Sequence, residues 1–204
     1  MSAAPARSTS DLARTALALS LFTVAYNVVE GVVSVVFAAL AGSAALLGFG
    51  VDSFVESLSG GIMIWRFWHP HGAHERERRA ATYVGWSLLI LAAYVAYEAV
   101  SALWMNRAPE QSLAAILIAL VSLVVMPILY LLKRRTALSV GSRSLLADSK
   151  QTLACSLLSV ALLIGAGANY WLGWWQADPI AAVVIAMYLL SEGLEVLRER
   201  ELCC

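Results

Sequence analysis

Six long apolar segments restrict most strongly what this chain can fold into. Each is close to the roughly 20 residues that an α-helix needs to cross a hydrocarbon core about 30 Å thick. Because lipid offers the backbone no hydrogen-bond partners, spanning segments of this kind are helical. The sequence therefore predicts an all-α integral membrane protein with six transmembrane helices, over residues 15–40, 44–66, 80–104, 111–132, 144–168 and 177–197.

Composition indicates the same environment. Of the 204 residues, 60% are hydrophobic and 14% are charged, whereas a soluble domain has about 25% charged residues. The formal net charge of +0 gives no indication of a nucleic-acid partner, and the three cysteines predict no disulfide framework. No nucleophile–base pair or cofactor-binding loop is apparent, so the chain is not expected to be an enzyme or to hold a resident cofactor.

Basic residues gather in the connections on one side of the predicted bundle, while the opposite connections hold only Arg107. Cytoplasmic loops are enriched in Lys and Arg, so both termini are expected in the cytoplasm. The expected organisation is a cytoplasmic tail over 1–14, a six-helix transmembrane domain over 15–198 and a short tail over 199–204. The basic residues behind this orientation are Arg7, Arg14, Arg66, Arg76, Arg78, Arg79, Lys133, Arg134, Arg135, Arg143, Arg198 and Arg200.

Two acidic residues lie inside the second apolar segment, in "LLGFGVDSFVESLSGGIMIW". A carboxylate at mid-depth costs about 2.5–3.5 kcal/mol on insertion scales, and such groups are functional candidates by default. Asp52 and Glu56 are four residues apart, which places them on one face of a helix. Two like charges there repel, so either one is protonated or a cation lies between them.

The fifth segment carries a second pair at the same spacing, Gln151 and Cys155. At about 1.5 Å per residue, Asp52 is expected near the level of Cys155, and Glu56 near that of Gln151. If the two helices are neighbours, two carboxylates, an amide oxygen and a thiolate converge. Mixed oxygen and sulfur ligands suit a tetrahedral divalent ion such as zinc. Alternatively, Cys155 is a small core residue and Gln151 bridges helices by hydrogen bonds.

Other polar residues also fall within apolar segments. Glu30 and Glu98 lie deep, and Asn27 shares a helical face with Glu30. Asp148 and Lys150 lie one turn from the cytoplasmic edge, where they either reach toward water or form an internal ion pair. Glu192 and Glu195, near the end of the sixth segment, are expected to reach water in the same way.

Four stretches, in this order, carry a family resemblance: "SAALLGFGVDSFVESLS", "HPHGAHERER", "SLLADSKQTLACSLLS" and "ADPIAAVVIAMYLLSEGLEVLRE". Together they resemble the second helix, the following loop, and the fifth and sixth helices of the cation diffusion facilitator (cation efflux) family. The resemblance covers about residues 27–200 and corresponds to a short variant without the usual C-terminal cytoplasmic domain. Relative to the family pattern, the loop holds an extra Ala73.

The resemblance implies a set of metal ligands. By position, Asp52 and Glu56 match the second-helix ligands, and Gln151 and Cys155 match the fifth-helix pair. In that pair the family has His or Asp followed by Asp, so this chain departs from the pattern at both positions. Asn27, Glu30 and Asp148 are expected behind the ligands or along the ion pathway. At a cytoplasmic entrance, cations could be collected by Glu192, Glu195, Asp148 and the loop residues His69, His71 and His74. Alternatively, the three histidines are ordinary solvated loop residues.

The resemblance further implies proton-coupled export of a divalent cation by alternating access, with Zn(II) first and Cd(II) second as cargo. The expected partners are lipid, metal ions, protons and a second copy of the chain, in a plasma or inner membrane. One alternative is a transporter of softer ions such as Cu(I), Hg(II) or Cd(II), since Cys155 is a thiolate donor. In that case Cys203 and Cys204 either relay the ion or are simply a short tail. The other is a non-transporting membrane protein that binds metal as a sensor or assembly partner.

Overall fold

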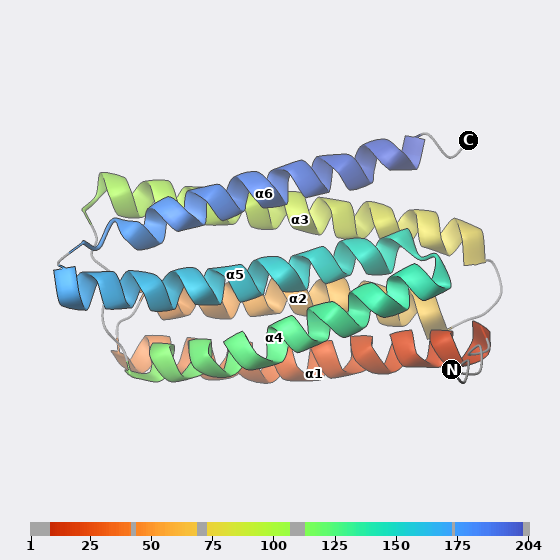
Figure 1. The fold of residues 1–204 in the computed structure, drawn as a ribbon, viewed down its shortest axis with the longest axis horizontal. Helices are drawn as coiled ribbons and strands as arrows, with labels where there is room; N and C mark the ends of the chain where they lie inside the picture. The colour runs from red at the N-terminus through yellow and green to blue at the C-terminus, as the bar shows by residue number, and fades with distance from the viewer. Residues whose placement is uncertain (1–8, 42–43, 69–72, 107–112, 173, 202–204) are drawn as a thin grey trace, which may run out of the picture.

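The computed structural model is an all-helical bundle, described over residues 9–41, 44–68, 73–106, 113–172 and 174–201 (Figure 1). Successive helices run in opposite directions, so α1 begins and α6 ends at the same end of the bundle (Figure 1). The all-α fold is as predicted. The helices are α1 (Thr9–Ala41), α2 (Ala44–Trp68), α3 (Ala73–Trp104), α4 (Leu113–Val140), α5 (Arg143–Leu172) and α6 (Ala177–Glu201).

Five of these helices are long and apolar enough to cross a membrane, within the described ranges. The candidate spans lie on α1, α3, α4, α5 and α6, whereas α2, which carries Asp52 and Glu56, is not among them. The sequence prediction of six spans is therefore supported for five helices. The spans are Ser10–Phe37, His74–Trp104, Ile116–Val140, Arg143–Ile164 and Pro179–Arg198.

The helices extend beyond the apolar segments that predicted them. α4 continues to Val140, so Lys133, Arg134 and Arg135 belong to a helix and not to the connection between the fourth and fifth segments. Hydropathy marks where a helix can meet lipid, whereas Lys and Arg are themselves good helix formers. The placement of Lys133 in a connection was wrong, and this residue is fully buried.

α5 is the central helix of the bundle. It packs against α2, α3, α4 and α6, while α1 pairs mainly with α2 and α3 with α6. In its membrane-length window 56% of the residues are buried, against 22–33% in the other four candidate spans. Residues of α5 can therefore meet side chains from several helices at once.

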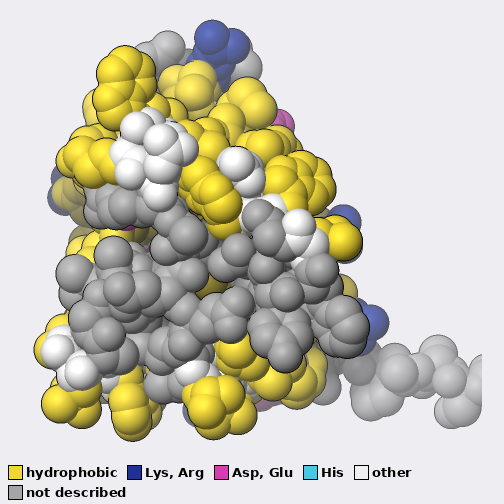
Figure 2. Space-filling view, turned by 90° about the vertical axis from the view of Figure 1, so that its left-hand side faces the viewer, with side chains coloured by type: hydrophobic (Ala, Val, Ile, Leu, Met, Phe, Trp, Pro, Cys, Tyr) yellow, Lys and Arg dark blue, Asp and Glu magenta, His cyan; other side chains and the backbone are white. Residues whose placement is uncertain are grey.

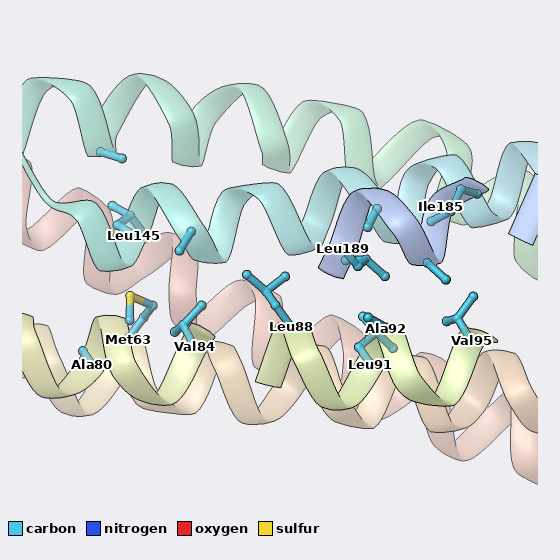
Figure 3. Packing of buried hydrophobic residues seen from close by; sticks show 14 of the residues in the cluster. Met63, Ala80, Val84, Leu88, Leu91, Ala92, Val95, Leu145, Ile185 and Leu189 are labelled. Atoms are coloured by element: carbon cyan, nitrogen blue, oxygen red, sulfur yellow. The ribbon is translucent and has the colours of Figure 1, made fainter. Parts of the chain in front are cut away.

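The apolar core lies between α3, α5 and α6. Figure 3 shows Leu88 and Leu91 of α3 extending toward Leu189 of α6, with Leu145 of α5 farther along. The outward faces are also apolar: Phe22, Val29 and many other large side chains are exposed. From the end shown in Figure 2, the described perimeter is mostly hydrophobic with few charged side chains. An apolar perimeter of this extent is typical of a surface that faces lipid.

The turn between α4 and α5 is held by a carboxylate from α3. Gly141, with a φ of 69°, ends α4, and the Ser142 amide donates to the Ala137 carbonyl over 3.0 Å, as in a Schellman motif. Glu77 accepts from the Ser144 amide over 2.7 Å and pairs with Arg66 of α2 at 2.7 Å. A negative charge at the first amides of α5 is favourable because those amides lack helical partners.

Glu77→Gln is expected to destabilise the bundle by about 1–2 kcal/mol, because it removes the charge at the α5 N-terminus and the pair with Arg66. Thermal unfolding of the detergent-purified protein measures this. Glu75→Gln is the matched control, since Glu75 is an exposed carboxylate of α3 paired with Arg78 and Arg79 and should change the melting temperature little. Equal melting temperatures for both variants would contradict the assigned role of Glu77.

Candidate cation site

Asp52 and Glu56 lie on the buried face of α2, one helical turn apart. Their exposed fractions are 3% and 0%. Both carboxylate oxygens of Asp52 and Oε2 of Glu56 are buried without a hydrogen-bond partner. Buried polar atoms are nearly always hydrogen-bonded, so three unpartnered carboxylate oxygens on one helical face require an explanation.

Two residues of α5 face these carboxylates. Thr152 donates a 2.6 Å hydrogen bond to Oε1 of Glu56. The buried Cys155 lies close enough to interact electrostatically with Asp52 and Glu56. Cys155 also packs in a small apolar cluster with Met126 and Leu129 of α4. Helices α2 and α5 are thus neighbours, with Cys155 beside Asp52 as the depth argument predicted.

Gln151 is buried on α5, but its hydrogen bond is with α3 and not with Glu56 of α2. Its amide oxygen accepts a 3.2 Å hydrogen bond from Ser87 of α3, and its amide nitrogen is buried without a partner. In this orientation Gln151 links α5 to α3 by a hydrogen bond, which agrees with the alternative that it bridges helices. Glu56 instead meets Thr152, the next residue along α5.

Lys133 of α4 was missed as a member of this site. Its Nζ lies 2.8 Å from Oδ2 of Asp148 and 3.9 Å from Oε1 of Glu56, and it donates a 2.9 Å hydrogen bond to Thr152. All four of these side chains are fully buried. The site is thus formed by three helices and contains a positive charge as well as carboxylates.

Helical spacing was the signal that could have revealed Lys133. Met126, Leu129, Lys133 and Ala137 recur at intervals of three and four residues, and all are buried. A helix that continues past Leu132 places Lys133 on the same face as the apolar residues that precede it. The three basic residues of "KRR" do not share one environment: Lys133 is buried, whereas Arg134 and Arg135 are exposed.

The other acids near the site have partners. Asp148 pairs with Lys133 and accepts a 2.6 Å hydrogen bond from Ser59 of α2. Lys150 pairs with Glu192 of α6 and lies 3.8 Å from Glu195. The expectation that Asp148 and Lys150 form an internal ion pair was wrong, because each pairs with a residue of another helix.

A polar cluster on α1 lies where α1 packs against α2 and α4. Glu30 accepts 2.9 Å hydrogen bonds from Tyr26 of α1 and Ser53 of α2. Asn27 is fully buried, and neither its amide oxygen nor its amide nitrogen has a hydrogen-bond partner. Glu30 interacts electrostatically with Asp52 and Glu56, so this cluster adjoins the site.

Within the described part of the chain, no three His, Cys, Asp or Glu side chains are placed so that they could jointly hold a metal ion. The side chains would have to reorient before Asp52, Glu56 and Cys155 could coordinate one ion together. His74 is exposed at the start of α3 and Glu98 is half-buried on the same helix. His69, His71, Cys203 and Cys204 lie outside the described residues.

Comparison with known proteins identifies the family of this chain. The chain is 22% identical over 188 residues to Transmembrane protein 163 of Xenopus laevis. That match covers 90% of this chain and 66% of the relative, so the chain spans just under two thirds of the relative's length. A model of the cation efflux transmembrane domain matches residues 20–200. The match extends from within α1 to the last turn of α6 and contains every residue of the candidate site, and the chain is a multi-pass membrane protein that belongs to the cation efflux family.

Proposed function

We propose that this chain carries a divalent cation, Zn(II) first among them, across the membrane by alternating access. The observation that carries the proposal is the set of unpartnered buried oxygens on Asp52 and Glu56, with the Cys155 sulfur beside them. A divalent cation would provide the partner that these oxygens lack. Membership of the cation efflux family supports cation transport as the general activity.

We assign Asp52, Glu56 and Cys155 as ligands, with Gln151 as the fourth. Gln151 would have to exchange its hydrogen bond with Ser87 for the cation. Its unpartnered amide nitrogen indicates that the present orientation does not satisfy the whole side chain. Asn27, Glu30 and Asp148 would support the ligands or line the pathway, since each lies beside α2 or α5 in the same buried region.

Protons are the proposed counter-ions. Carboxylate and thiolate ligands must be deprotonated to bind a metal, so cation binding releases protons. When the site opens to the opposite side, protons from that side displace the cation. Asp52 and Glu56 would thus act both as ligands and as proton carriers, which accounts for two acids in one apolar helix.

The orientation and assembly belong to the same proposal. Six spans within residues 15–198 with both termini in the cytoplasm would place Lys150, Glu192 and Glu195 near a cytoplasmic entrance. The start of α1 and the end of α6 lie at the same end of the bundle, which is compatible with that arrangement (Figure 1). A homodimer is the expected assembly by the family resemblance.

Zn(II) flux into proteoliposomes is expected to depend on an opposing pH gradient and to fall to the rate of empty liposomes when that gradient is collapsed. A metal-sensitive fluorophore inside the vesicles measures flux, and Glu75→Gln serves as the control for a carboxylate outside the site. Flux that persists unchanged without the gradient would contradict proton coupling. Binding without any flux would favour the sensor or assembly-partner alternative.

A softer cargo such as Cd(II) is a second candidate, and one observation favours it. Cys155 is 1% exposed and lies beside Asp52, so a sulfur donor is available inside the site. Thiolate ligands select softer metals than carboxylates do.

A further inference from the structure

Lys133 is an unusual component for a cation site. It is among the largest fully buried side chains of the described residues, and the positions one turn before and after it on the same face of α4, Leu129 and Ala137, are apolar. Burial of an ammonium is costly unless the charge is paired and hydrogen-bonded. Here Asp148 supplies the pair at 2.8 Å, and Thr152 supplies a 2.9 Å hydrogen bond.

The same ammonium also faces a proposed cation ligand. Lys133 Nζ lies 3.9 Å from Oε1 of Glu56. Between them, the Thr152 hydroxyl accepts from Lys133 and donates to that same Glu56 oxygen. Lys133 is therefore connected to Glu56 both directly by charge and through one hydroxyl group.

A purely structural role explains only part of this geometry. A buried ion pair adds little net stability compared with apolar residues of similar size, so pairing with Asp148 alone gives weak reason to keep a lysine here. The charges indicate more. Asp52, Glu56 and Asp148 are three carboxylates, and the proposed ligand Cys155 adds a further negative charge when it is ionised, against the single ammonium of Lys133. The site therefore keeps a net negative charge after Lys133 is paired, and a divalent cation would offset it.

We propose that Lys133 is a tethered competitor of the transported cation, which lowers the affinity of the site by holding a positive charge beside Glu56. This inference rests on the proposed function, because it requires a cation at Glu56. When a cation binds, like-charge repulsion drives the ammonium from Glu56 toward Asp148, its nearer partner. When the cation leaves, the ammonium again neutralises Glu56 and favours release.

Equilibrium binding of Zn(II) by calorimetry tests this inference. Lys133→Gln keeps a hydrogen-bond donor but removes the charge, and it is expected to tighten binding about tenfold or more. Asp148→Asn releases the ammonium to Glu56 and is expected to weaken binding by about the same factor. The double variant K133Q/D148N removes one positive and one negative charge together, so the site keeps the net charge of the wild type and its affinity should return toward the wild-type value.

Transport kinetics provide a second readout. If Lys133→Gln holds the cation more tightly, the KM for Zn(II) flux should fall together with the maximal rate, because a cation bound too tightly leaves slowly. Lys133→Met replaces the lysine by an apolar residue of similar length and should likewise lower both the KM and the maximal rate of Zn(II) flux. A merely structural lysine would instead give reduced stability with unchanged or weaker binding.

The outcomes separate this inference from the proposed function. If wild type binds no Zn(II) or Cd(II), the proposed function itself fails. If wild type binds and Asp52→Asn abolishes binding, the site stands. In that case, unchanged or weaker binding by Lys133→Gln with a native melting profile overturns the role of Lys133, and tighter binding with recovery in K133Q/D148N supports it.

Discussion

Asp52→Asn is expected to abolish Zn(II) transport and to leave the bundle at least as stable as the wild type. Neither oxygen of Asp52 accepts a hydrogen bond of normal geometry, and among the described residues the Cys155 thiol approaches them as a weak donor, so the substitution removes at most that thiol contact. It does remove a buried carboxylate, whose desolvation is costly when uncompensated. The affinity for Zn(II) should fall by about 100-fold or more, since a ligand charge is lost.

Calorimetry for binding and thermal unfolding in metal-free buffer measure the two effects together. Glu75→Gln, an exposed acid on α3, is the matched control and should change neither. Asp52→Asn with normal transport would show that this carboxylate is not a ligand. Loss of transport together with a much lower melting temperature would show a structural role instead.

Cys155→Ser is expected to shift the preference of the site from Cd(II) toward Zn(II), by about tenfold in the ratio of affinities. The change replaces a soft donor by a hard one with almost the same volume. Cys155 also packs against Met126 and Leu129, so a modest loss of stability is expected from placing a hydroxyl in an apolar cluster.

Competition binding between Cd(II) and Zn(II) measures this preference. Cys155→Ala removes the donor while keeping an apolar side chain, and it should weaken binding of both ions. An unchanged Cd(II) to Zn(II) ratio in Cys155→Ser would identify Cys155 as a packing residue only, which was the alternative interpretation of its sequence position.

The helical bundle could be predicted from the sequence because few backbone structures satisfy all their hydrogen bonds within lipid. The six apolar segments correspond to the six helices, and the spacing of Asp52 and Glu56 placed both carboxylates on one buried face. Equal spacing and matched depth also predicted that Cys155 would lie beside Asp52. Each of these depends on helical geometry, which is nearly the same in every sequence.

The sequence does not show which side chains pair across helices, and the continuation of α4 past its apolar part was missed although the spacing of Leu129, Lys133 and Ala137 indicates it. Lys133 was counted as a charge in a connection, although α4 carries it into the core to meet Asp148. Gln151 was expected beside Glu56, but its neighbour Thr152 makes that contact. A single residue along a helix rotates the side chain by about 100°, and spacing alone does not fix that rotation between two helices.

X-ray absorption spectroscopy of the Zn(II)-loaded protein tests most directly whether a cation lies between α2 and α5. The account predicts one sulfur neighbour at about 2.3 Å together with oxygen neighbours at about 2.0–2.2 Å. The sulfur should disappear in Cys155→Ser, and the bound metal should be lost in Asp52→Asn. A metal shell made of oxygen or nitrogen alone in the wild type, unchanged by either substitution, would contradict a cation site formed by Asp52, Glu56 and Cys155.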